Sequence, residues 1–327
     1  MSMVEKILIT GGAGFIGSNL CGFLMNKGSG VVCLDNFDDF YSEEIKRKNI
    51  NGLVNSPLFE LIEGDIRDTR ILQTIFSNNQ IKLVIHLAAK AGVINSIANP
   101  KEYFDVNVNG SASLFEVMNK HNVRNLIFSS SSSVYGNIEK KLSETDMCEN
   151  QISPYAETKR TVEKLSYKYH TDSSFNVINL RLFSVYGERQ RPDLVLHKFL
   201  NNIVNNEPIQ VYGGGNTTRD YTYISDVVNA FNASIELLIN TNEAIYEIIN
   251  IGNDYPVSLN MLIDLISSTT MTSHIQIIKK DFVQGDVNNT HADISKAKKL
   301  LNYNPETTIK QGIEQFHKWF QENQIVK

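Results

Sequence analysis

The stretch Thr10-Gly11-Gly12-Ala13-Gly14-Phe15-Ile16-Gly17 decides the fold of this 327-residue chain. It follows a strand-like apolar run at residues 6–9 and opens a segment with helical periodicity at residues 17–26. The three spaced glycines suit, in order, a tight turn, close approach of backbone to a diphosphate, and close packing of helix on strand. The helix N-terminus adds N–H donors and the positive end of a helix dipole. This motif predicts a dinucleotide-binding turn, and a purely structural glycine turn is the alternative.

Apolar runs of strand length alternate with helix-like segments over about the first 180 residues. The runs are continuous rather than alternating with polar residues, as expected when helices cover both faces of a sheet. We therefore predict an α/β fold with a doubly wound parallel sheet of the Rossmann type. The expected strands are 6–9, 31–34, 59–62, 83–87, 125–128 and 177–180, and the expected helices are 17–26, 67–77, 112–120 and 156–169.

After about residue 184 the regular alternation ends and short polar turns appear. We predict that residues 1–184 form the dinucleotide-binding domain, to which 219–253 return, and that 185–218 and 254–327 form a smaller C-terminal substrate-binding domain. The elements expected in this second region are helices at 225–239, 258–267 and 309–321 and a strand at 275–278.

Composition excludes several classes of protein. The 31 Lys and Arg against 36 Asp and Glu give a net charge of −5, so no overall bias favours nucleic acid or an anionic membrane, and any bound phosphate must be met locally. Cys21, Cys33 and Cys148 form no paired motif, which argues against a disulfide framework or a metal site. No apolar run approaches the roughly 18 residues of a membrane span, and the first strand begins too early to leave room for a signal peptide. We expect a soluble, cytoplasmic protein.

Acidic residues follow the second and third expected strands. Asp35 stands eighteen residues after Gly17, where a carboxylate holds adenosine ribose hydroxyls and repels a 2′-phosphate. It favours NAD over NADP, although the basic residues 46–48 leave NADP open. Asp65 is suited either to the adenine amino group or to capping the helix expected at 67–77.

Two further motifs carry the expected chemistry. Five serines at 129–133 continue directly from the strand at 125–128, and the carboxyl end of such a strand faces the ligand crevice. Tyr155 and Lys159 are four residues apart and therefore share one helix face. An ammonium beside a phenol favours the phenolate, so Tyr155 is expected to act as a base near neutral pH. Either motif alone also fits a structural role, but the combination with the glycine turn points to catalysis.

These ordered motifs resemble the extended short-chain dehydrogenase/reductases of the NAD-dependent epimerase/dehydratase family. Within that family the chain is most similar to nucleotide-sugar 4-epimerases, the UDP-glucuronate 4-epimerase group above all. The resemblance is carried by TGGAGFIG at 10–17, HLAA at 86–89, SSSSSVYG at 129–136, YAETK at 155–159, RPD at 191–193, RDYT at 219–222 and GDV at 285–287.

The resemblance implies NAD as the cofactor and a reaction in which the sugar C4 is transiently oxidised. Tyr155 then removes the proton of the sugar 4-hydroxyl, Ser131 shares a hydrogen bond with that hydroxyl, and Lys159 anchors the nicotinamide ribose. The 4-keto sugar then rotates about its diphosphate link and receives the hydride on its other face. The residues expected to contact NAD are Gly11, Gly14, Phe15, Ile16, Gly17, Asp35, Asn36, Asp65, Ile66, Leu87, Ala88, Ala89, Asn107, Tyr155 and Lys159.

The same resemblance implies a UDP-sugar site. Arg219 and Arg191 are expected to bind the diphosphate, because an arginine fork holds phosphate oxygens with two donors; a surface ion pair is the alternative for each. Tyr212 is expected against the uracil and Asp286 on the uridine ribose. Ser132, Ser184 and Thr290 are expected in the sugar pocket, where a residue of the size of Thr290 admits a hexose or an N-acetylhexosamine.

Three positions bear on the reaction and the sugar. The 4,6-dehydratases carry Asp and Glu at the positions of Ser132 and Ser133, and the decarboxylases carry Glu at the latter, so their absence favours epimerisation. Ile94 replaces an arginine that the glucuronate group uses, which opens UDP-N-acetylglucosamine and UDP-glucose beside UDP-glucuronate. We predict a homodimeric UDP-sugar 4-epimerase without metal, nucleic-acid or membrane partners. A dehydratase or decarboxylase and a non-catalytic nucleotide-sugar-binding module are the alternatives.

Overall fold

Seven parallel strands form the central sheet of the computed structural model, which describes residues 5–241, 243–281 and 287–323. The strand order is β10-β6-β5-β4-β1-β2-β3, and every neighbouring pair is parallel. The predicted doubly wound parallel sheet is therefore confirmed. Its strands are β1 (Lys6–Thr10), β2 (Gly30–Asp35), β3 (Phe59–Glu63), β4 (Ile81–His86), β5 (Asn125–Ser131), β6 (Asn176–Leu182) and β10 (Tyr246–Ile251).

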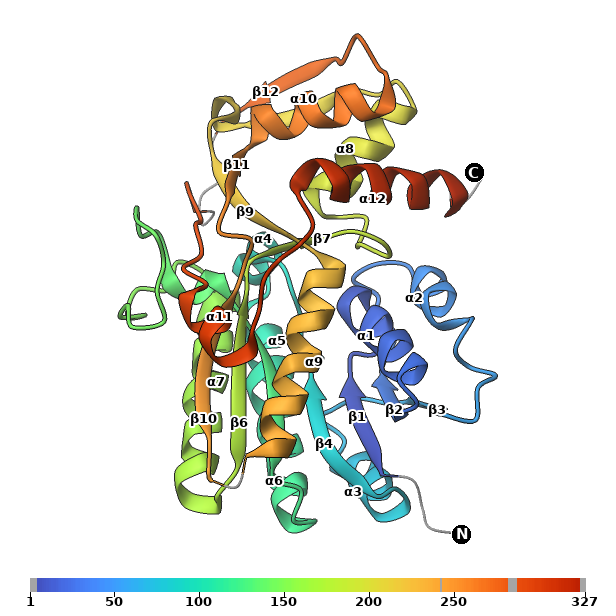
Figure 1. Ribbon diagram of the computed structural model, residues 1–327, viewed down its shortest axis with the longest axis vertical. Helices are drawn as coiled ribbons and strands as arrows, with labels where there is room; N and C mark the ends of the chain where they lie inside the picture. The colour runs from blue at the N-terminus through green and yellow to red at the C-terminus, as the bar shows by residue number, and fades with distance from the viewer. Residues whose placement is uncertain (1–4, 242, 282–286, 324–327) are drawn as a thin grey trace.

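Helices cover both faces of this sheet, as Figure 1 shows. One core lies beneath α1 (Phe15–Asn26) and α9 (Ile224–Asn240), and a second lies beneath α3 (Thr69–Asn78), α6 (Gly110–Lys120) and α7 (Pro154–Ser173). Burial on both faces explains the continuous apolar runs, since a strand such as β2 is buried at every residue. Burial of these apolar side chains thus holds one layer of helices against each face of the sheet.

The sheet extends beyond the six strands expected from the sequence. β10 pairs with β6 at its edge, so part of the segment 219–253 joins the sheet, and α9 of the same segment packs on one face. β5 is three residues longer than expected, because the strand continues beyond its apolar run through the buried polar residues Ser129, Ser130 and Ser131. Polar side chains at a buried strand end mark the edge of the sheet where a site is built.

The N-terminus of α7 is defined by local chemistry. Ser153 caps the helix by accepting a 3.2 Å hydrogen bond from the backbone N–H of Ala156, and Pro154 occupies the first helical position. Proline is preorganised for that position and has no N–H to leave unsatisfied. The cap fixes where Tyr155 and Lys159 emerge, one turn apart on the same face.

Most of the second region lies beyond the carboxyl ends of the parallel strands, while its helix at 295–301 packs against α9 and β10 (Figure 1). It holds a three-stranded sheet in the order β11-β9-β7 and a two-stranded sheet of β12 and β8. The strand expected at 275–278 begins two residues later than predicted, and the helices expected at 258–267 and 309–321 are both present. The elements of the region are β7 (Ser184–Tyr186), α8 (Val195–Val204), β8 (Ile209–Tyr212), β9 (Thr218–Tyr223), β11 (Pro256–Ser258), α10 (Leu259–Thr270), β12 (Ile277–Lys280), α11 (Ser295–Leu301) and α12 (Ile309–Asn323).

Several short elements were not predicted, because they are too brief to show a period. They connect the long strands and helices: α2 (Glu43–Ile50), α4 (Val93–Ala98), α5 (Pro100–Phe104), the π-helix η1 (Asp105–Asn109), and the 3₁₀ turns η2 (Ser132–Tyr135) and η3 (Gly213–Gly215). Within the described ranges, no helix is long and apolar enough to cross a membrane. The same residues hold no cluster of three or more metal-ligating side chains.

Candidate active site

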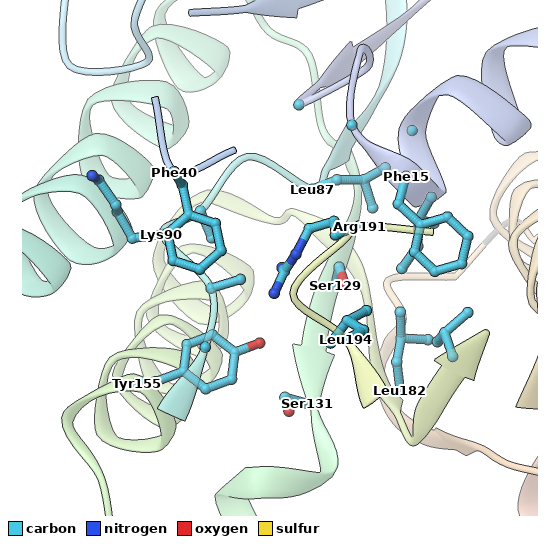
Figure 2. A pocket seen from close by; sticks show the side chains of 18 of the residues that line it. Phe15, Phe40, Leu87, Lys90, Ser129, Ser131, Tyr155, Leu182, Arg191 and Leu194 are labelled. Carbon is cyan, nitrogen blue, oxygen red and sulfur yellow. The ribbon is translucent and has the colours of Figure 1, made fainter. Parts of the chain in front are cut away.

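A cavity of about 600 Å³ opens at the carboxyl ends of the central strands. Its wall is formed by the glycine turn, the ends of β2, β4 and β5, the start of α7 and residues of the second region. Figure 2 shows side chains from these elements converging on one space. This is the edge at which open α/β sheets bind their ligands.

The glycine turn suits an anionic ligand. Gly11 has a φ of +72°, and a Cβ there would lie 2.8 Å from the backbone nitrogen of Ala88. A Cβ on Gly17 would lie 2.2 Å from the carbonyl oxygen of Gly11. Only glycine fits either place. Gly14 is the N-cap of α1, and no side chain caps this helix. Its first N–H groups and the positive end of its dipole therefore face the cavity, as a diphosphate requires.

Asp35 is a fixed carboxylate at the end of β2. It is buried, and its two oxygens accept hydrogen bonds from the backbone N–H of Ala13 (3.0 Å) and of Phe37 (2.9 Å). Burial raises the pKa of Asp35, while these two hydrogen bonds and the Lys46 ammonium act to lower it. Each carboxylate oxygen keeps a lone pair toward the cavity. The position fits the ribose hydroxyls that the sequence predicts.

Asp65 also lines the cavity, and it does not cap the following helix. The cap of α3 is Asp68, whose side chain accepts a 2.9 Å hydrogen bond from the N–H of Arg70. Asp65 instead accepts hydrogen bonds from the Arg67 guanidinium and from the Asn36 amide. The guanidinium holds the pKa of Asp65 below its usual value. The proposed contact with adenine stays a prediction.

Ser131, Tyr155 and Lys159 come together in the cavity. The Tyr155 hydroxyl points toward Ser131 and toward the guanidinium of Arg191 (Figure 2). Lys159 is buried beside them, and its Nζ donates a 2.7 Å hydrogen bond to the carbonyl oxygen of Ser129. The Nζ lies 4.9 Å from the ring centroid of Phe128 and 5.9 Å from that of Tyr155. A hydroxyl, a phenol and an ammonium at one strand end can carry proton transfer at a substrate hydroxyl.

The charges around this group differ in one respect from the sequence-based expectation. Burial raises the pKa of Tyr155, and the groups that act to lower it are the Ser131 hydroxyl and the Arg191 guanidinium. Lys159 was expected to do so, but its ammonium faces the carbonyl of Ser129. Burial lowers the pKa of Lys159 to about 7, against the opposing effect of the Glu163 carboxylate.

A buried ion cluster lies next to Lys159 on the same helix. Glu163 accepts hydrogen bonds from Ser130 (2.6 Å), from Arg160 (2.8 Å) and from two nitrogens of Arg181 (2.9 and 2.8 Å). The side chains of Glu163 and Arg181 are 0% and 2% exposed. Their mutual hydrogen bonds compensate for the desolvation of both charges. The cluster joins α7 to β5 and β6 directly beneath the site.

Asn107 does not line the cavity, although it was expected to contact the cofactor. Its side-chain oxygen accepts a 2.7 Å hydrogen bond from the N–H of Lys90, and its amide nitrogen donates to the carbonyl of Lys90 and to Thr158. The whole amide is therefore used inside the protein. Asn107 fixes the segment after β4, whose backbone forms part of the cavity wall.

The expected substrate residues divide into three groups. Thr290 is buried outside the cavity wall, where its hydroxyl accepts a 3.0 Å hydrogen bond from the N–H of Asp220. Asp286 lies outside the described residues. The other expected substrate residues line the cavity: Ser132, Ser184, Arg191, Tyr212 and Arg219. All of the expected cofactor residues except Asn107 line it too.

Arg191 and Arg219 both line the cavity. The Arg191 side chain is 17% exposed and makes a two-point ion pair with Asp193, at 2.9 and 2.7 Å. Its guanidinium lies 5.1 Å from the ring centroid of Phe40. Arg219 donates to the carbonyl oxygens of Thr218 (2.9 Å) and Asn288 (3.1 Å). Both arginines are thus held by neighbouring groups while they face the ligand space.

Some residues of the cavity wall were not predicted from the sequence. Phe40, Tyr41 and Lys46 come from the segment that follows β2, and Lys90 lines the cavity while paired with Asp38 (3.1 Å) and Glu102 (2.7 Å). Only their nearness to Asp35 and to the HLAA motif could have suggested them. Ile94 is 58% exposed and does not line the cavity.

Comparison with known proteins identifies the family. A family model described as GDP-mannose 4,6 dehydratase matches residues 8–316. The chain is 38% identical over 321 residues to UDP-glucuronate 4-epimerase of Thermodesulfobacterium geofontis, which covers 97% of this chain and 96% of that protein. Both similarities span nearly the whole length.

Two solved structures share the fold along the whole chain. UDP-glucuronic acid 4-epimerase of Bacillus cereus, in complex with UDP-glucuronic acid and NAD, matches with a TM-score of 0.91 and 34% identity over 97% of this chain and 99% of that one. UDP-N-acetylglucosamine 4-epimerase of Methanobrevibacter ruminantium, in complex with UDP-N-acetylmuramic acid, matches with a TM-score of 0.88 and 29% identity over 98% and 100%. With its glycine turn, YxxxK pair and parallel sheet, the chain belongs to the GDP-mannose 4,6-dehydratase family of extended short-chain dehydrogenase/reductases.

Proposed function

We propose that this chain is an NAD-dependent UDP-sugar 4-epimerase. The observation that carries the proposal is the meeting of Ser131, Tyr155 and Lys159 in a cavity that also contains the glycine turn and two arginines. Relatives that align along nearly the whole chain are 4-epimerases of UDP-sugars, and one was crystallised with NAD. Fold, site residues and relatives therefore support the same reaction class.

In this proposal the protein supplies acid–base chemistry and positioning. Tyr155 takes the proton of the sugar 4-hydroxyl, and Ser131 holds that hydroxyl by a hydrogen bond. The Ser131 hydroxyl and the positive charge of Arg191 favour the phenolate and act against the effect of burial. NAD supplies the redox chemistry, taking the hydride from C4 and returning it. Tyr155 then gives the proton back to the oxygen of the inverted centre.

The segment after Ser131 supports epimerisation over elimination. The hydroxyls of Ser132 and Ser133 stand where the dehydratases carry an acid and a base, and a serine hydroxyl does neither task at neutral pH. Ser133 donates its N–H to the Ser131 oxygen at 3.2 Å, so its local role is to orient Ser131. A 4-keto sugar in this site lacks a carboxylate partner for loss of water, and return of the hydride remains.

For the sugar, we propose UDP-glucuronate as the preferred substrate. Arg191 faces Tyr155 in the cavity, and its charge acts on the tyrosine, so a cation is available near the reacting end of the sugar. Lys90 adds a second cation in the wall. UDP-N-acetylglucosamine is the second candidate, since Thr290 lies outside the cavity wall and leaves room beside the sugar.

We propose the following assignment of the chain to these tasks. Residues 1–184 with most of 219–253 bind NAD, and residues 185–218 with 254–327 bind the UDP-sugar. Arg219, at the start of the returning segment, binds the diphosphate of the UDP-sugar, Arg191 lies near the reacting end of the sugar, and Tyr212 lies against the uracil. The homodimer, built on the helices α6 and α7, and the cytoplasmic location are further parts of this proposal. Light scattering behind a sizing column tests the dimer.

The experiment for the reaction class is incubation of the purified protein with UDP-glucuronate, UDP-glucose and UDP-N-acetylglucosamine, without added NAD. The expected product is inverted at C4, with no loss of water or CO₂ and no net NADH. A 4-keto-6-deoxy sugar or a pentose contradicts epimerisation. A protein that binds UDP-sugars and turns over none is a binding module.

A further inference from the structure

The hydroxyl of Tyr41 is a buried polar group with no hydrogen-bond partner in the structure. Tyr41 belongs to the segment between β2 and α2, and it lines the cavity. Burying a hydroxyl without a partner costs free energy, and buried polar groups in native proteins are nearly always satisfied. An orphaned hydroxyl in a binding cavity therefore points to a ligand atom as its partner.

The position of this hydroxyl indicates which ligand atom that is. A Cβ built on Gly14 would lie 4.0 Å from the Tyr41 oxygen. Gly14 caps α1, the helix whose N-terminus follows the glycine turn. The hydroxyl thus faces the same small space as the free N–H groups of that helix, which is where a dinucleotide diphosphate is bound.

Tyr41 reaches this space as a neutral phenol, whose O–H can donate to an anionic oxygen. Burial and the nearby Asp35 and Asp193 carboxylates raise its pKa, and Arg191 only partly opposes them. The group therefore stays a protonated phenol through the physiological range. The Tyr41 hydroxyl makes no hydrogen bond to either of these carboxylates, so neither Asp35 nor Asp193 is its acceptor. An anionic ligand oxygen is the acceptor that this geometry lacks.

The ring that carries the hydroxyl is held in place before any ligand arrives. The Nζ of Lys46 lies 4.7 Å from the centroid of the Tyr41 ring. Lys46 is buried, and it is fixed in turn by donating a hydrogen bond to the carbonyl oxygen of Asp38. A donor on a rigid aromatic ring loses little conformational freedom on binding, so its hydrogen bond contributes most of its strength to affinity.

We propose that the Tyr41 hydroxyl donates a hydrogen bond to the diphosphate of NAD, and that it closes the cofactor site opposite the N-terminus of α1. The proposal rests on the proposed use of NAD. It assigns a function in cofactor retention to the segment 37–46, which no sequence motif marks. The competing acceptor is the diphosphate of the UDP-sugar, because Arg191 also lies near this hydroxyl.

The test compares three holoenzymes: the wild type, Tyr41→Phe and, as a matched control, Tyr255→Phe. Tyr255 is 53% exposed and is not part of the cavity wall, so its hydroxyl has no expected contact with NAD. Each protein is loaded with radiolabelled NAD and chased with excess unlabelled NAD, and the release rate is measured without UDP-sugar. The KM for the UDP-sugar is measured separately.

We expect Tyr41→Phe to release NAD about tenfold faster or more, the loss typical of one hydrogen bond to a charged acceptor. Tyr255→Phe should release it at the wild-type rate. Because Phe keeps the ring and removes an unpartnered group, a circular-dichroism spectrum like that of the wild type is expected. An unchanged release rate overturns the proposal, and an unchanged rate with a raised KM assigns the hydroxyl to the substrate instead.

The two proposals fail in distinguishable ways. A chain that retains NAD but inverts no UDP-sugar contradicts the proposed function and leaves the effect of Tyr41→Phe on NAD release measurable. A wild-type chain that binds no NAD overturns both.

Discussion

The ammonium of Lys159 donates a 2.7 Å hydrogen bond to the carbonyl oxygen of Ser129. This contact is buried and joins α7, which carries Tyr155, to β5, which carries Ser131. Because helix and strand come from segments about 25 residues apart in the chain, tertiary contacts of this kind set the relation between the phenol and the serine. Lys159 thus aligns helix and strand at the site.

Lys159 gives a pH dependence of stability with a defined sign. Its pKa is lowered from 10.5 to about 7 in the folded chain by burial, so between these values the unfolded chain binds more protons than the folded one. Stability contributed by this group therefore rises with pH from about 7 to 10.5, by at most about 1.4 kcal/mol per pH unit.

Urea unfolding of the cofactor-free protein at pH 7, 8 and 9 checks this against Lys159→Met, which cannot titrate. As the pH rises, the free energy of unfolding of the wild type should increase relative to that of the variant. A constant difference between the two proteins contradicts the lowered pKa.

Tyr155→Phe removes the acid–base group while it keeps the ring. Turnover should fall by about 10²- to 10⁴-fold, the usual contribution of one general acid–base group. Bound NAD should be retained, because the phenol is one of many expected cofactor contacts. NMR of the sugar C4 configuration measures the first effect, and absorbance of extracted cofactor measures the second. Full activity of this variant would show that Tyr155 is not the acid–base group of the reaction.

Glu163→Gln should destabilise the fold severely. The change leaves the buried Arg181 guanidinium without its counter-charge, which typically costs on the order of 3–5 kcal/mol. The control is Glu157→Gln on the exposed side of the same helix, where a change of less than about 1 kcal/mol is expected. Urea unfolding of both variants measures the difference, and equal effects would show that the buried cluster contributes no more than a surface charge.

Asp35→Ala should weaken the preference for NAD over NADP. The wild-type carboxylate repels a 2′-phosphate, and its fixed position makes that repulsion effective. We expect the ratio of the two dissociation constants, measured by titration calorimetry, to fall by about tenfold or more, since loss of a hydrogen bond to a charged group alone has that effect. Extraction of NADP rather than NAD from the wild-type protein would contradict the assignment outright.

The sheet could be predicted from the sequence because its signals are local and strong. The glycine turn fixes the first strand and helix, and strands buried on both faces leave continuous apolar runs. The motif of Tyr155 and Lys159 could be placed on one helix face for the same reason. The return of 246–251 to the sheet was expected only as part of a longer segment.

The cavity contacts of residues 37–46 and the hydrogen-bond partners of two polar residues could not be predicted. Phe40, Tyr41 and Lys46 reach the cavity through a connection without any period, so their contacts depend on tertiary packing alone. Asn107 and Thr290 were assigned to ligands, but their polar atoms bind neighbouring backbone. A motif shows that a polar group is needed at a position and leaves open whether its partner is a ligand or the chain itself.

The most direct test of the proposed epimerisation uses a UDP-sugar that carries deuterium at C4. The purified protein is incubated with it in ordinary water, without added cofactor, and the product is read by NMR and mass spectrometry. If a hydride leaves C4 and returns to the other face of the same sugar within one site, the inverted product keeps its deuterium at C4. Loss of the deuterium to solvent, or deuterium retained without inversion at C4, would contradict it.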